Sequence, residues 1–391
     1  MVYVLIVLTT ALFAACGIEY FRHVRCRGAV GLRVHVNGTR GKSSVARLIG
    51  AGLRAGGIRT VVKTTGSAAR LIFEDGSEHP IARPGPPRVI EQLRMFRVAA
   101  RRGADAMVIE CMALQPYLQF LSEWKIVRAG IAVITNVRPD HLDVMGPDVD
   151  GVALALAGMV PRGGVLVTRQ SPYDAFFRRV CAESGTALHL VTDGDVEKVT
   201  PEELSRFGYI EHAENVAVSL AACQAAGVDR GEALAGMFSV QPDLGALRVF
   251  RGRCDAGRWT FADGFAANDP ESSAMLWDML NERYPGQARR ILVVNCRADR
   301  LDRSRQLGQM MAGRVRADRY VVVGAETRMA IQPARDAGLE ADRVVDMEGA
   351  SSEEVFAGLL EAVGGDTLIV GMGNIKGIGE DLSARFREAS S

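Results

Sequence analysis

The sequence predicts an α/β protein with two domains, each built on a mostly parallel sheet, and one membrane-spanning helix in front of them. Short runs rich in valine and isoleucine alternate with helical stretches along most of the chain, which is typical of parallel strands joined by helices. A glycine-rich turn joins the first such run to the first helical stretch, and a turn of this kind suits phosphate. Residues 1–18 carry no charge and are long enough to cross a bilayer.

The composition fits a globular protein. Apolar residues make up 48% of the 391 residues and charged residues 24%, which is enough apolar material for two or three domain cores. The net charge of +1 indicates no nucleic-acid partner. The seven cysteines are odd in number and form no C-x-x-C pair, which is typical of free thiols in a reducing compartment.

The apolar N-terminus is interpreted as an uncleaved anchor helix over residues 1–21. The basic residues that follow it are Arg22, His23, Arg25 and Arg27. Positive charge after a span keeps the following chain in the cytoplasm, so we expect a single-pass protein of the cell membrane with both folded domains in the cytoplasm. A secretory signal would need basic residues before the apolar run, and the lipoprotein-like motif at 13–16 has Phe where Leu is usual.

The alternating pattern breaks near residues 241–245, so we predict a first domain over 28–243 and a second over 246–391. Candidate strands of the first domain lie at 32–36, 60–63, 106–110, 130–135 and 164–168. Candidate strands of the second domain lie at 291–295, 320–324 and 367–371. The stretch 83–88, rich in proline and glycine, is expected to be a surface loop.

The segment 36–44, Val-Asn-Gly-Thr-Arg-Gly-Lys-Ser-Ser, is the strongest functional signal. It precedes a helix predicted over 45–55, and its glycines let backbone N–H groups point inward, an arrangement that suits phosphate. Lys42 can reach terminal phosphate oxygens, and the Ser43 hydroxyl can bind Mg²⁺. The loop is short, because two residues rather than the usual four separate its first glycine from the Gly-Lys pair. The alternative is a helix cap that happens to contain lysine.

The rarity of lysine supports the phosphate interpretation. The chain contains five lysines against forty-two arginines. Arginine binds phosphate through a planar fork and lysine acts as a compact point charge, so the two are not equivalent in such a loop. A lysine kept at position 42 therefore indicates a specific role.

Polar side chains also follow two other predicted strands. Glu110 ends an apolar run at the edge where parallel sheets bind ligands, and its carboxylate can hold Mg²⁺. Asp140 and His141 come after the strand at 130–135. A histidine beside carboxylates can ligate a metal or contact phosphate, and the alternative is a hydrogen-bonded turn.

Two further segments are weaker candidates. Lys63, Thr64 and Thr65 follow the second strand and offer a charge and hydroxyls near the same sheet edge, or form a plain polar loop. Asn215 lies at the start of an alanine-rich helix. Its default role is to cap that helix, and the alternative is a contact with nucleotide.

Together these motifs resemble the Mur ligase superfamily, which includes muramyl-peptide ligases and folylpolyglutamate synthases. Over its whole length the chain is similar to the ligase subunit of poly-γ-glutamate synthases, the PgsB/CapB type. The motifs that carry this resemblance lie at 63–66, 110–113, 140–147, 265–269, 295–300 and 371–375. The resemblance implies a Mur-ligase-like phosphate-loop domain followed by a Rossmann-like α/β domain that closes over it.

The resemblance also implies an ATP-dependent ligase that joins an acid to an amino acid, with ATP and Mg²⁺ as cofactors. The nucleotide-binding residues it implies are Gly38, Thr39, Arg40, Gly41, Lys42, Ser43, Ser44, Asn215 and Arg248. The catalytic residues would be Lys42, Glu110 and His141. Ser43 and Glu110 would hold one Mg²⁺, and His141 would serve a second metal. The substrate-contacting residues would be Lys63, Thr64, Thr65, Asn268, Asp269, Arg297 and Arg300.

The chain departs from the family pattern in three places. Asn268-Asp269-Pro270 stands where many relatives have His-Asn-Pro, which leaves the roles of these residues open. The phosphate-binding segment begins directly after the anchor, which leaves no room for the nucleotide-sugar domain of muramyl ligases. No lysine lies between 126 and 197, so a second Mg²⁺ has no carbamoylated lysine as ligand.

We therefore expect a ligase that extends γ-linked polyglutamate through an acyl phosphate and releases ADP and phosphate. Its expected partners are glutamate, the polyglutamate chain, the membrane and small integral-membrane subunits, and an oligomer is possible. The alternatives are a glutamate ligase acting on a folate-like acceptor, a membrane-bound ATPase that powers polymer export, and a binding protein with a degenerate nucleotide fold. The intact Lys42, Glu110 and His141 argue against the last.

Overall fold

The structure is a computed structural model that describes every residue except 1, 66–68, 84–87, 242–246, 268–269 and 391. It divides the chain into two compact units, Met1–Asp243 (unit 1) and Leu244–Ser391 (unit 2). The predicted break at 241–245 and the predicted surface loop at 83–88 fall largely outside the described residues.

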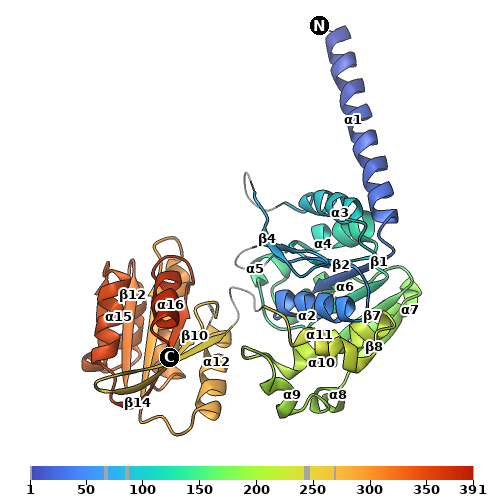
Figure 1. The fold of residues 1–391 in the computed structure, drawn as a ribbon. Helices are drawn as coiled ribbons and strands as arrows, with labels where there is room; N and C mark the ends of the chain where they lie inside the picture. Colours follow the sequence, from blue (N-terminus) through green and yellow to red (C-terminus); the bar gives the residue numbers. More distant parts are fainter. Residues whose placement is uncertain (1, 66–68, 84–87, 242–246, 268–269, 391) are drawn as a thin grey trace. The chain divides into compact units, whose positions relative to one another are not determined.

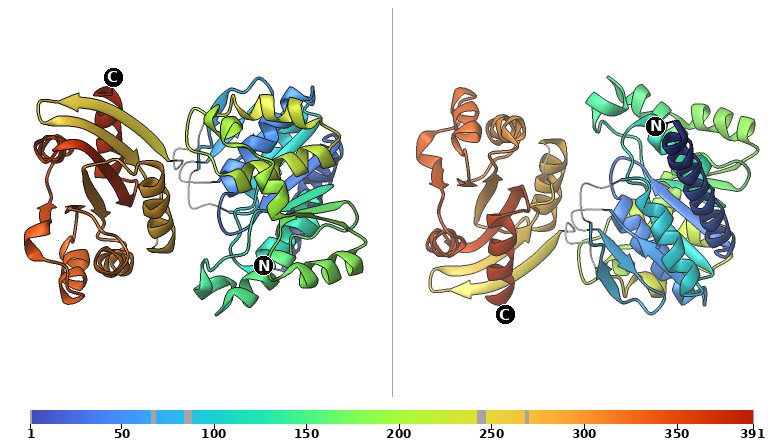
Figure 2. Two further views of the ribbon diagram at one scale, coloured as in Figure 1. Left: turned by 90° about the horizontal axis from the view of Figure 1, so that it is seen from below. Right: turned by 90° about the horizontal axis from the view of Figure 1, so that it is seen from above.

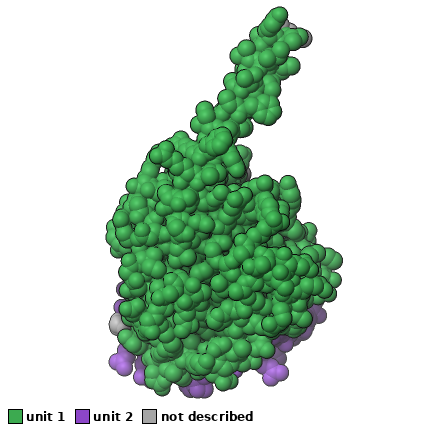
Figure 3. Space-filling model, turned by 90° about the vertical axis from the view of Figure 1, so that its right-hand side faces the viewer, with its two compact units in different colours: residues 1–243 green, residues 244–391 purple. Residues whose placement is uncertain are grey.

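Unit 1 begins with a long apolar helix, α1 (Val2–Gly28), which runs directly into the first strand (Figure 1). Among the described residues it is the one helix long and apolar enough to cross a membrane, and its apolar window is not buried against the protein. Figure 3 shows it projecting from the rest of unit 1. Its last turns contact the rest of unit 1: Glu19 pairs with Arg97 at 2.6 Å, and Arg27 donates to the Lys125 carbonyl at 2.8 Å.

The sheet of unit 1 has eight strands. They are β1 (Leu32–Asn37), β2 (Thr60–Lys63), β3 (Arg70–Ile72), β4 (Glu78–Pro80), β5 (Ala106–Glu110), β6 (Ile131–Ile134), β7 (Val165–Arg169) and β8 (Ala187–Val191). Their order is β4-β3-β2-β5-β1-β6-β7-β8. Strands β2, β5, β1, β6, β7 and β8 run parallel, and β3 and β4 add an antiparallel edge. The carboxyl ends of the parallel strands therefore meet at one edge of the sheet.

Helices cover both faces of this sheet (Figures 1 and 2). The helices are α2 (Lys42–Ala55), α3 (Glu91–Arg101), α4 (Pro116–Leu121), the π-helix η1 (Ser122–Val127), α5 (Leu142–Met145), α6 (Val149–Ala157), α7 (Asp174–Ser184), α8 (Asp193–Glu197), α9 (Pro201–Ser205), α10 (Ala213–Ala225) and α11 (Arg230–Met237). Side chains alternate between the faces of a strand. Val34 and Val36 of β1 accordingly join the core under α2, α10 and α11, whereas Met107 and Ile109 of β5 pack with α3.

Unit 2 is a second α/β layer structure. Its strands are β9 (Arg248–Cys254), β10 (Gly257–Asp263), β11 (Arg289–Cys296), β12 (Arg319–Gly324), β13 (Val344–Glu348) and β14 (Gly365–Gly373). Its helices are α12 (Pro270–Arg283), α13 (Leu301–Gly313), α14 (Arg328–Asp336), the short 3₁₀ turn η2 (Ala341–Arg343), α15 (Ser352–Glu361) and α16 (Ile378–Glu388). The order is β13-β12-β11-β14-β10-β9, parallel except for β9. Phe386 of α16 stacks on Phe261 in its core, with ring centres 3.9 Å apart.

The predicted fold class is confirmed, with corrections in detail. The apolar runs predicted as parallel strands are strands, although their ends differ by one or more residues. The prediction missed β3, β4, β8 and β13 at sheet edges and the β9–β10 hairpin. Edge strands are partly exposed, as β8 is, so they lack the continuous apolar pattern of a buried parallel strand. The helix predicted to begin at residue 45 begins at Lys42, because Gly41 is its N-cap.

Candidate active site

We call residues 38–44 the phosphate loop. They comprise the turn after β1 and the first residues of α2, and two glycines shape the turn. Gly38 has φ 128° and Gly41 has φ 79°, conformations that side chains rarely adopt. A Cβ on Gly38 would overlap Thr135 Oγ1, and one on Gly41 would lie 2.5 Å from Asn215 Oδ1. The loop backbone therefore packs directly on the segment after β6 and on α10, which leaves no space for larger residues.

The segment after β6 holds the phosphate loop in place through side-chain hydrogen bonds. Thr39 Oγ1 donates to Asn136 Oδ1 at 2.5 Å, and the Arg40 N–H donates to the same oxygen at 3.0 Å. Thr135 Oγ1 donates to the Arg40 carbonyl at 2.6 Å. Sequence reasoning gave Thr135 and Asn136 no role, although they stand at the carboxyl end of a predicted strand, where such contacts arise.

Lys42 lies over the phosphate loop. Its ammonium donates to the Gly38 carbonyl at 2.7 Å and to the Thr39 carbonyl at 3.0 Å. No side chain caps the N-terminus of α2, so its first N–H groups face the same turn as the ammonium. A lysine charge and a helix N-terminus thus converge on one concave backbone, which is an arrangement suited to phosphate.

Glu110, at the end of β5, contacts the start of α2 and the segment after β2. It is 2% exposed at the end of β5, and its Oε2 accepts a hydrogen bond from Ser43 Oγ at 2.9 Å. The same oxygen accepts the Thr65 N–H at 2.5 Å. The predicted pair Ser43 and Glu110 is therefore in direct contact, and the two present hard oxygen atoms beside the phosphate loop, the ligand type that Mg²⁺ prefers.

Lys63, predicted to contact substrate, is fully buried behind Glu110. Its Nζ lies 3.4 Å from Glu91 Oε1 and 3.5 Å from Met112 Sδ. Burial lowers the pKa of Lys63, and the charges of Glu91 and Glu110 oppose that shift. Thr64 is also buried, and its Oγ1 accepts the Arg70 N–H at 3.2 Å. This geometry places Lys63 and Thr64 in the packing around Glu110 and leaves the partly buried Thr65 nearest to solvent.

His141 lies beside the phosphate loop but not in a formed metal cluster. Its Nε2 is 3.8 Å from Asp140 Oδ1, and the same carboxylate oxygen is 3.7 Å from Arg40 Nη2. Its backbone is left-handed, with φ 45°. Among the residues that the structure describes, no three His, Cys, Asp or Glu side chains gather to hold a metal. A cation here would need phosphate oxygens or water to complete its ligand shell.

Asn215 does not cap α10, contrary to the default expectation. The N-cap is His212, so Asn215 lies inside the first turn. Its Nδ2 donates to Glu211 Oε1 at 2.8 Å, and its carbonyl oxygen faces Gly41. Glu211, which sequence reasoning missed, also accepts the Tyr209 hydroxyl at 3.0 Å and thereby fixes the orientation of the amide.

In unit 2, Arg248 and Asp263 are paired across β9 and β10. They line a cavity of about 270 Å³ together with Phe250, Ile375 and Glu380. Burial raises the pKa of Asp263 to about 6. Sequence reasoning missed Asp263, although it ends an alternating run immediately before a glycine.

Two further predicted residues of unit 2, Arg297 and Arg300, follow β11. Arg297 donates to both carboxylate oxygens of Asp299 at 2.9 Å, and Arg300 Nε lies 3.9 Å from the same residue. Asn268 and Asp269 lie outside the described residues. The structure thus gathers the unit 1 predictions around the phosphate loop and leaves those of unit 2 in separate clusters within that unit.

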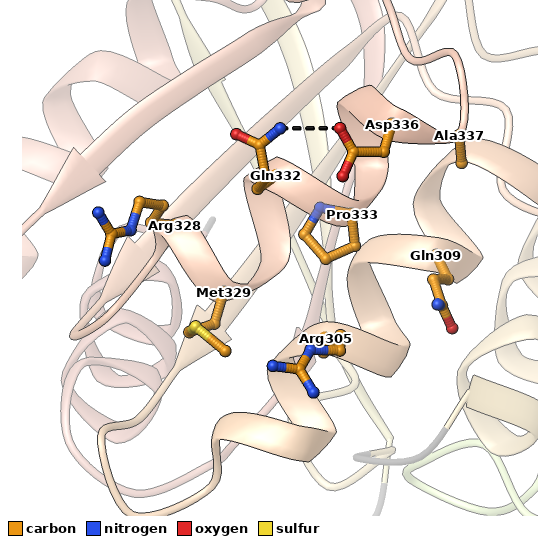
Figure 4. A pocket seen from close by; sticks show the side chains of 8 residues that line it. All are labelled: Arg305, Gln309, Arg328, Met329, Gln332, Pro333, Asp336 and Ala337. Carbon is orange, nitrogen blue, oxygen red and sulfur yellow. Dashed lines mark hydrogen bonds between the residues drawn. The ribbon is translucent and has the colours of Figure 1, made fainter.

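A larger cavity in unit 2 contains none of the predicted site residues. It measures about 550 Å³ and lies between α13 and α14, lined by Arg305, Arg328, Gln332 and Asp336 among others (Figure 4). Gln332 donates to Asp336 at 2.8 Å across one turn of α14. Size alone therefore does not identify the active site of this chain.

Comparison with known proteins gives two matches to family models and relatives that align over most of this chain. Residues 36–198 match the Mur ligase middle domain, and residues 249–389 match the poly-gamma-glutamate synthase CapB C-terminal domain. The PGA synthase CapB of Bacillus subtilis (strain 168) is 36% identical over 98% of this chain and 98% of its own length. The capsule biosynthesis protein CapB of Bacillus anthracis is 35% identical over 92% of this chain and 77% of its own length.

Solved structures share the fold at low sequence identity. The bifunctional folylpolyglutamate synthase/dihydrofolate synthase of Yersinia pestis, complexed with AMPPNP and Mn ion, superposes with a TM-score of 0.70. The match covers 94% of this chain and 92% of that chain at 14% identity. This likeness concerns the arrangement of both units' elements and not their side chains.

Proposed function

The chain belongs to the CapB family of poly-γ-glutamate synthases, and we propose that its ATP-dependent glutamate ligase activity extends a γ-linked chain through an acyl phosphate. The observation that carries this proposal is the cluster of Lys42, Ser43 and Glu110 at the phosphate loop. A lysine charge and a hydroxyl at the start of α2, with a carboxylate from the end of β5 beside them, suit the transfer of a γ-phosphoryl group.

The phosphate loop would hold the β- and γ-phosphates through backbone N–H groups from Gly38 to Ser44. Lys42 would exchange the Gly38 and Thr39 carbonyls, which it contacts in this structure, for phosphate oxygens. The hydrogen bonds from Thr135 and Asn136 keep the loop preorganised, so little reorganisation accompanies charge development. Asn215 lies close enough to Gly41 to contact the nucleotide. The nucleotide contact of Arg248 stays a prediction from family resemblance.

The residues at the phosphate loop fit a divalent cation. Ser43 Oγ and Glu110 Oε2, 2.9 Å apart, form the partial oxygen set that Mg²⁺ commonly uses together with phosphate oxygens and water. When bound, Mg²⁺ would neutralise charge on the transferring phosphoryl group. The Thr65 N–H orients the carboxylate. His141, with Asp140 beside it, is the proposed ligand for a second cation.

The chemistry of the step follows from the poor reactivity of a carboxylate. A carboxylate oxygen attacks the γ-phosphorus of ATP, the bond to the bridging oxygen breaks, and ADP leaves. The amine of the next glutamate attacks the acyl carbon, loses a proton, and expels phosphate. Lys42 and the N-terminus of α2 stabilise the charge that develops on phosphate oxygens. Holding the carboxylate and ATP, and then the acyl phosphate and the amine, in contact lowers the barrier of each step.

An isotope experiment tests the acyl phosphate directly. Glutamate carrying ¹⁸O in its γ-carboxylate is supplied with ATP to membranes that contain the full chain. We expect one ¹⁸O atom in the released phosphate for each amide bond formed, because the activated oxygen leaves with phosphorus. Label found in AMP, or polymer formed without label in phosphate, would contradict the proposed intermediate.

The helix α1 supports a membrane location. Its length and composition suffice to span a bilayer, and basic residues follow the apolar run. We propose a single-pass protein whose two units face the cytoplasm, where ATP is available. The exposed apolar surface of α1 is also where small integral-membrane subunits of a synthase complex would bind.

A further inference from the structure

A cavity in unit 1 lies at the sheet edge opposite the phosphate loop. It measures about 660 Å³. Arg33 at the start of β1, Gly130 before β6 and Gly164 before β7 line it, and these are the amino ends of parallel strands. The phosphate loop follows the carboxyl end of β1. The cavity is therefore separate from the candidate active site.

The cavity combines arginines with stacked aromatic rings. Arg162 lies over the Trp124 ring at 3.8 Å, and Phe120 stacks on Trp124 with ring centres 5.6 Å apart. Arg33 donates to the Arg128 carbonyl at 2.9 Å. Arg33 Nη1 also donates to the Val30 and Gly31 carbonyls, and Arg128 Nε donates to the Trp124 carbonyl at 3.1 Å. Each arginine is thus held by a carbonyl or by a ring.

The cavity has no free negative charge to match these arginines. Within the described part of the chain, Arg33, Arg128 and Arg162 take part in no ion pair. The carboxylate that lines the cavity belongs to Glu123, and it already accepts the Ala129 N–H at 2.7 Å and lies 2.8 Å from His35 Nδ1. Burial lowers the pKa of Arg33, and the charge of Glu123 opposes that shift. The guanidinium groups that take part in no ion pair favour binding of an anion in this cavity.

The cavity lies at the height of the lipid headgroups if α1 spans the bilayer. Residues 2–21 extend about 30 Å along the helix, which equals the thickness of the hydrocarbon core. The exposed rings of Tyr20 and Phe21 end this stretch, as aromatic residues commonly do at the membrane interface. Arg27 follows within about 9 Å and donates to the Lys125 carbonyl, next to Trp124. Unit 1 thus holds the cavity close to the membrane surface.

We propose that this cavity binds the phosphate headgroup of an anionic phospholipid, with Arg128 and Arg162 as the main ligands and Trp124 at the interface. The inference rests on the proposed membrane anchoring by α1. Guanidinium groups bind phosphate through paired, charge-assisted hydrogen bonds, and basic pockets beside a membrane-spanning helix are suited to such headgroups.

Native mass spectrometry of the full chain in detergent micelles, without nucleotide, tests the proposal. The chain is titrated with phosphatidylglycerol and, separately, with phosphatidylcholine, whose phosphate charge is balanced by choline. We expect preferential retention of phosphatidylglycerol and roughly tenfold weaker binding in the double variant Arg128→Gln/Arg162→Gln, which loses two charge-assisted contacts. Arg162→Lys keeps the charge and should retain most of the affinity. Arg316→Gln removes an exposed arginine of unit 2 and should change nothing.

Several results would overturn the proposal. Equal retention of the two lipids would do so, as would unchanged phosphatidylglycerol binding in a double variant with normal thermal melting. Displacement of the lipid by equimolar inorganic phosphate, or by polyglutamate, would show that the cavity takes a soluble anion instead. If the double variant melts early, Arg162→Gln alone carries the test, because that side chain is exposed.

The outcome is independent of ligase chemistry. Lipid retention is measured without ATP or glutamate, so an inactive enzyme can still bind lipid. Anchoring is checked separately by flotation of the chain with phosphatidylcholine vesicles. A chain that floats but shows no preference for phosphatidylglycerol would contradict the lipid-binding proposal without contradicting the proposed anchor or the ligase activity.

Discussion

At the residue scale, Lys42 supplies the positive charge of the phosphate loop. Its ammonium contacts two loop carbonyls, and its removal leaves the phosphate loop without its fixed positive charge. We expect Lys42→Ala to lower ligase turnover by roughly 10²- to 10³-fold, the usual loss when one charge-stabilising donor is removed, while thermal melting stays close to normal. Turnover is measured as glutamate-dependent ADP release. Lys198→Ala, which removes an exposed lysine, is the matched control, and normal turnover by Lys42→Ala would contradict the assignment.

Glu110 permits a test of the metal site. Glu110→Gln keeps an oxygen to accept the Ser43 hydroxyl and the Thr65 N–H but removes the negative charge. We expect the Mg²⁺ concentration needed for half-maximal activity to rise about tenfold or more. A titration of activity against Mg²⁺ measures this shift. Glu183→Gln, at an exposed position on α7, should leave the titration unchanged, and an identical titration for Glu110→Gln would exclude Glu110 as a ligand.

Part of the site could be predicted at this scale. Lys42 and Ser43 stand in one short motif, and Glu110 ends an apolar run that is a parallel strand paired with β1, so these residues meet at the carboxyl edge of the sheet. The role of Asn136 could not be predicted, because it depends on a contact between segments far apart in the chain. Glu211, by contrast, lies only four residues before Asn215, from whose amide it accepts a hydrogen bond, and was overlooked. Lys63, predicted to contact substrate, is instead fully buried, and its burial depends on α3, which supplies Glu91.

At the scale of elements, the π-helix η1 connects the anchor to the strand that carries the phosphate loop. Its Lys125 carbonyl accepts Arg27 of α1, and its Glu123 lies 2.8 Å from His35 of β1. The pair is buried. Burial opposes protonation of His35, but hydrogen bonds with Cys111 and Glu123 outweigh it and raise the pKa of His35 to about 9.

This buried pair makes the stability of unit 1 depend on pH. The folded-state pKa of His35 lies above its unfolded value of 6.5, so its contribution is complete below about pH 6.5 and is lost as the pH rises through about 9. We expect the melting temperature of unit 1, followed by Trp124 fluorescence, to fall over this range. The fall should be smaller in the double variant His35→Gln/Glu123→Gln, and an equal fall in both proteins would refute the assignment.

The elements that sequence could not predict have common physical causes. β3 and β4 are three residues each, too short for a period-two pattern to be read. The π-helix follows α4 without a sequence break, and its Glu123 contacts His35 of β1, which is distant in the chain. The parallel strands were predictable because both faces of the sheet bury them, which gives continuous apolar runs.

At the scale of the whole molecule, three parts with distinct roles follow one another along the chain. α1 offers an exposed apolar surface, unit 1 carries the phosphate loop, and unit 2 carries the Arg248–Asp263 pair. Family membership gives the activity, which bulk charge and composition could not have indicated. The proposed lipid cavity would add a reason for unit 1 to lie against the membrane, because it lies at the amino ends of the parallel strands, where α1 leads into β1.

The central claim is that ATP hydrolysis at the phosphate loop is coupled to glutamate addition. Membranes that carry the full chain are supplied with ATP and labelled glutamate, and nucleotide products and polymer are measured together, with Lys42→Ala membranes as the control. The expected result is ADP and phosphate released in step with a polymer that resists ordinary peptidases, with both products reduced at least about a hundredfold in the Lys42→Ala control. AMP and pyrophosphate, or ADP release that is the same without glutamate, would contradict the claim.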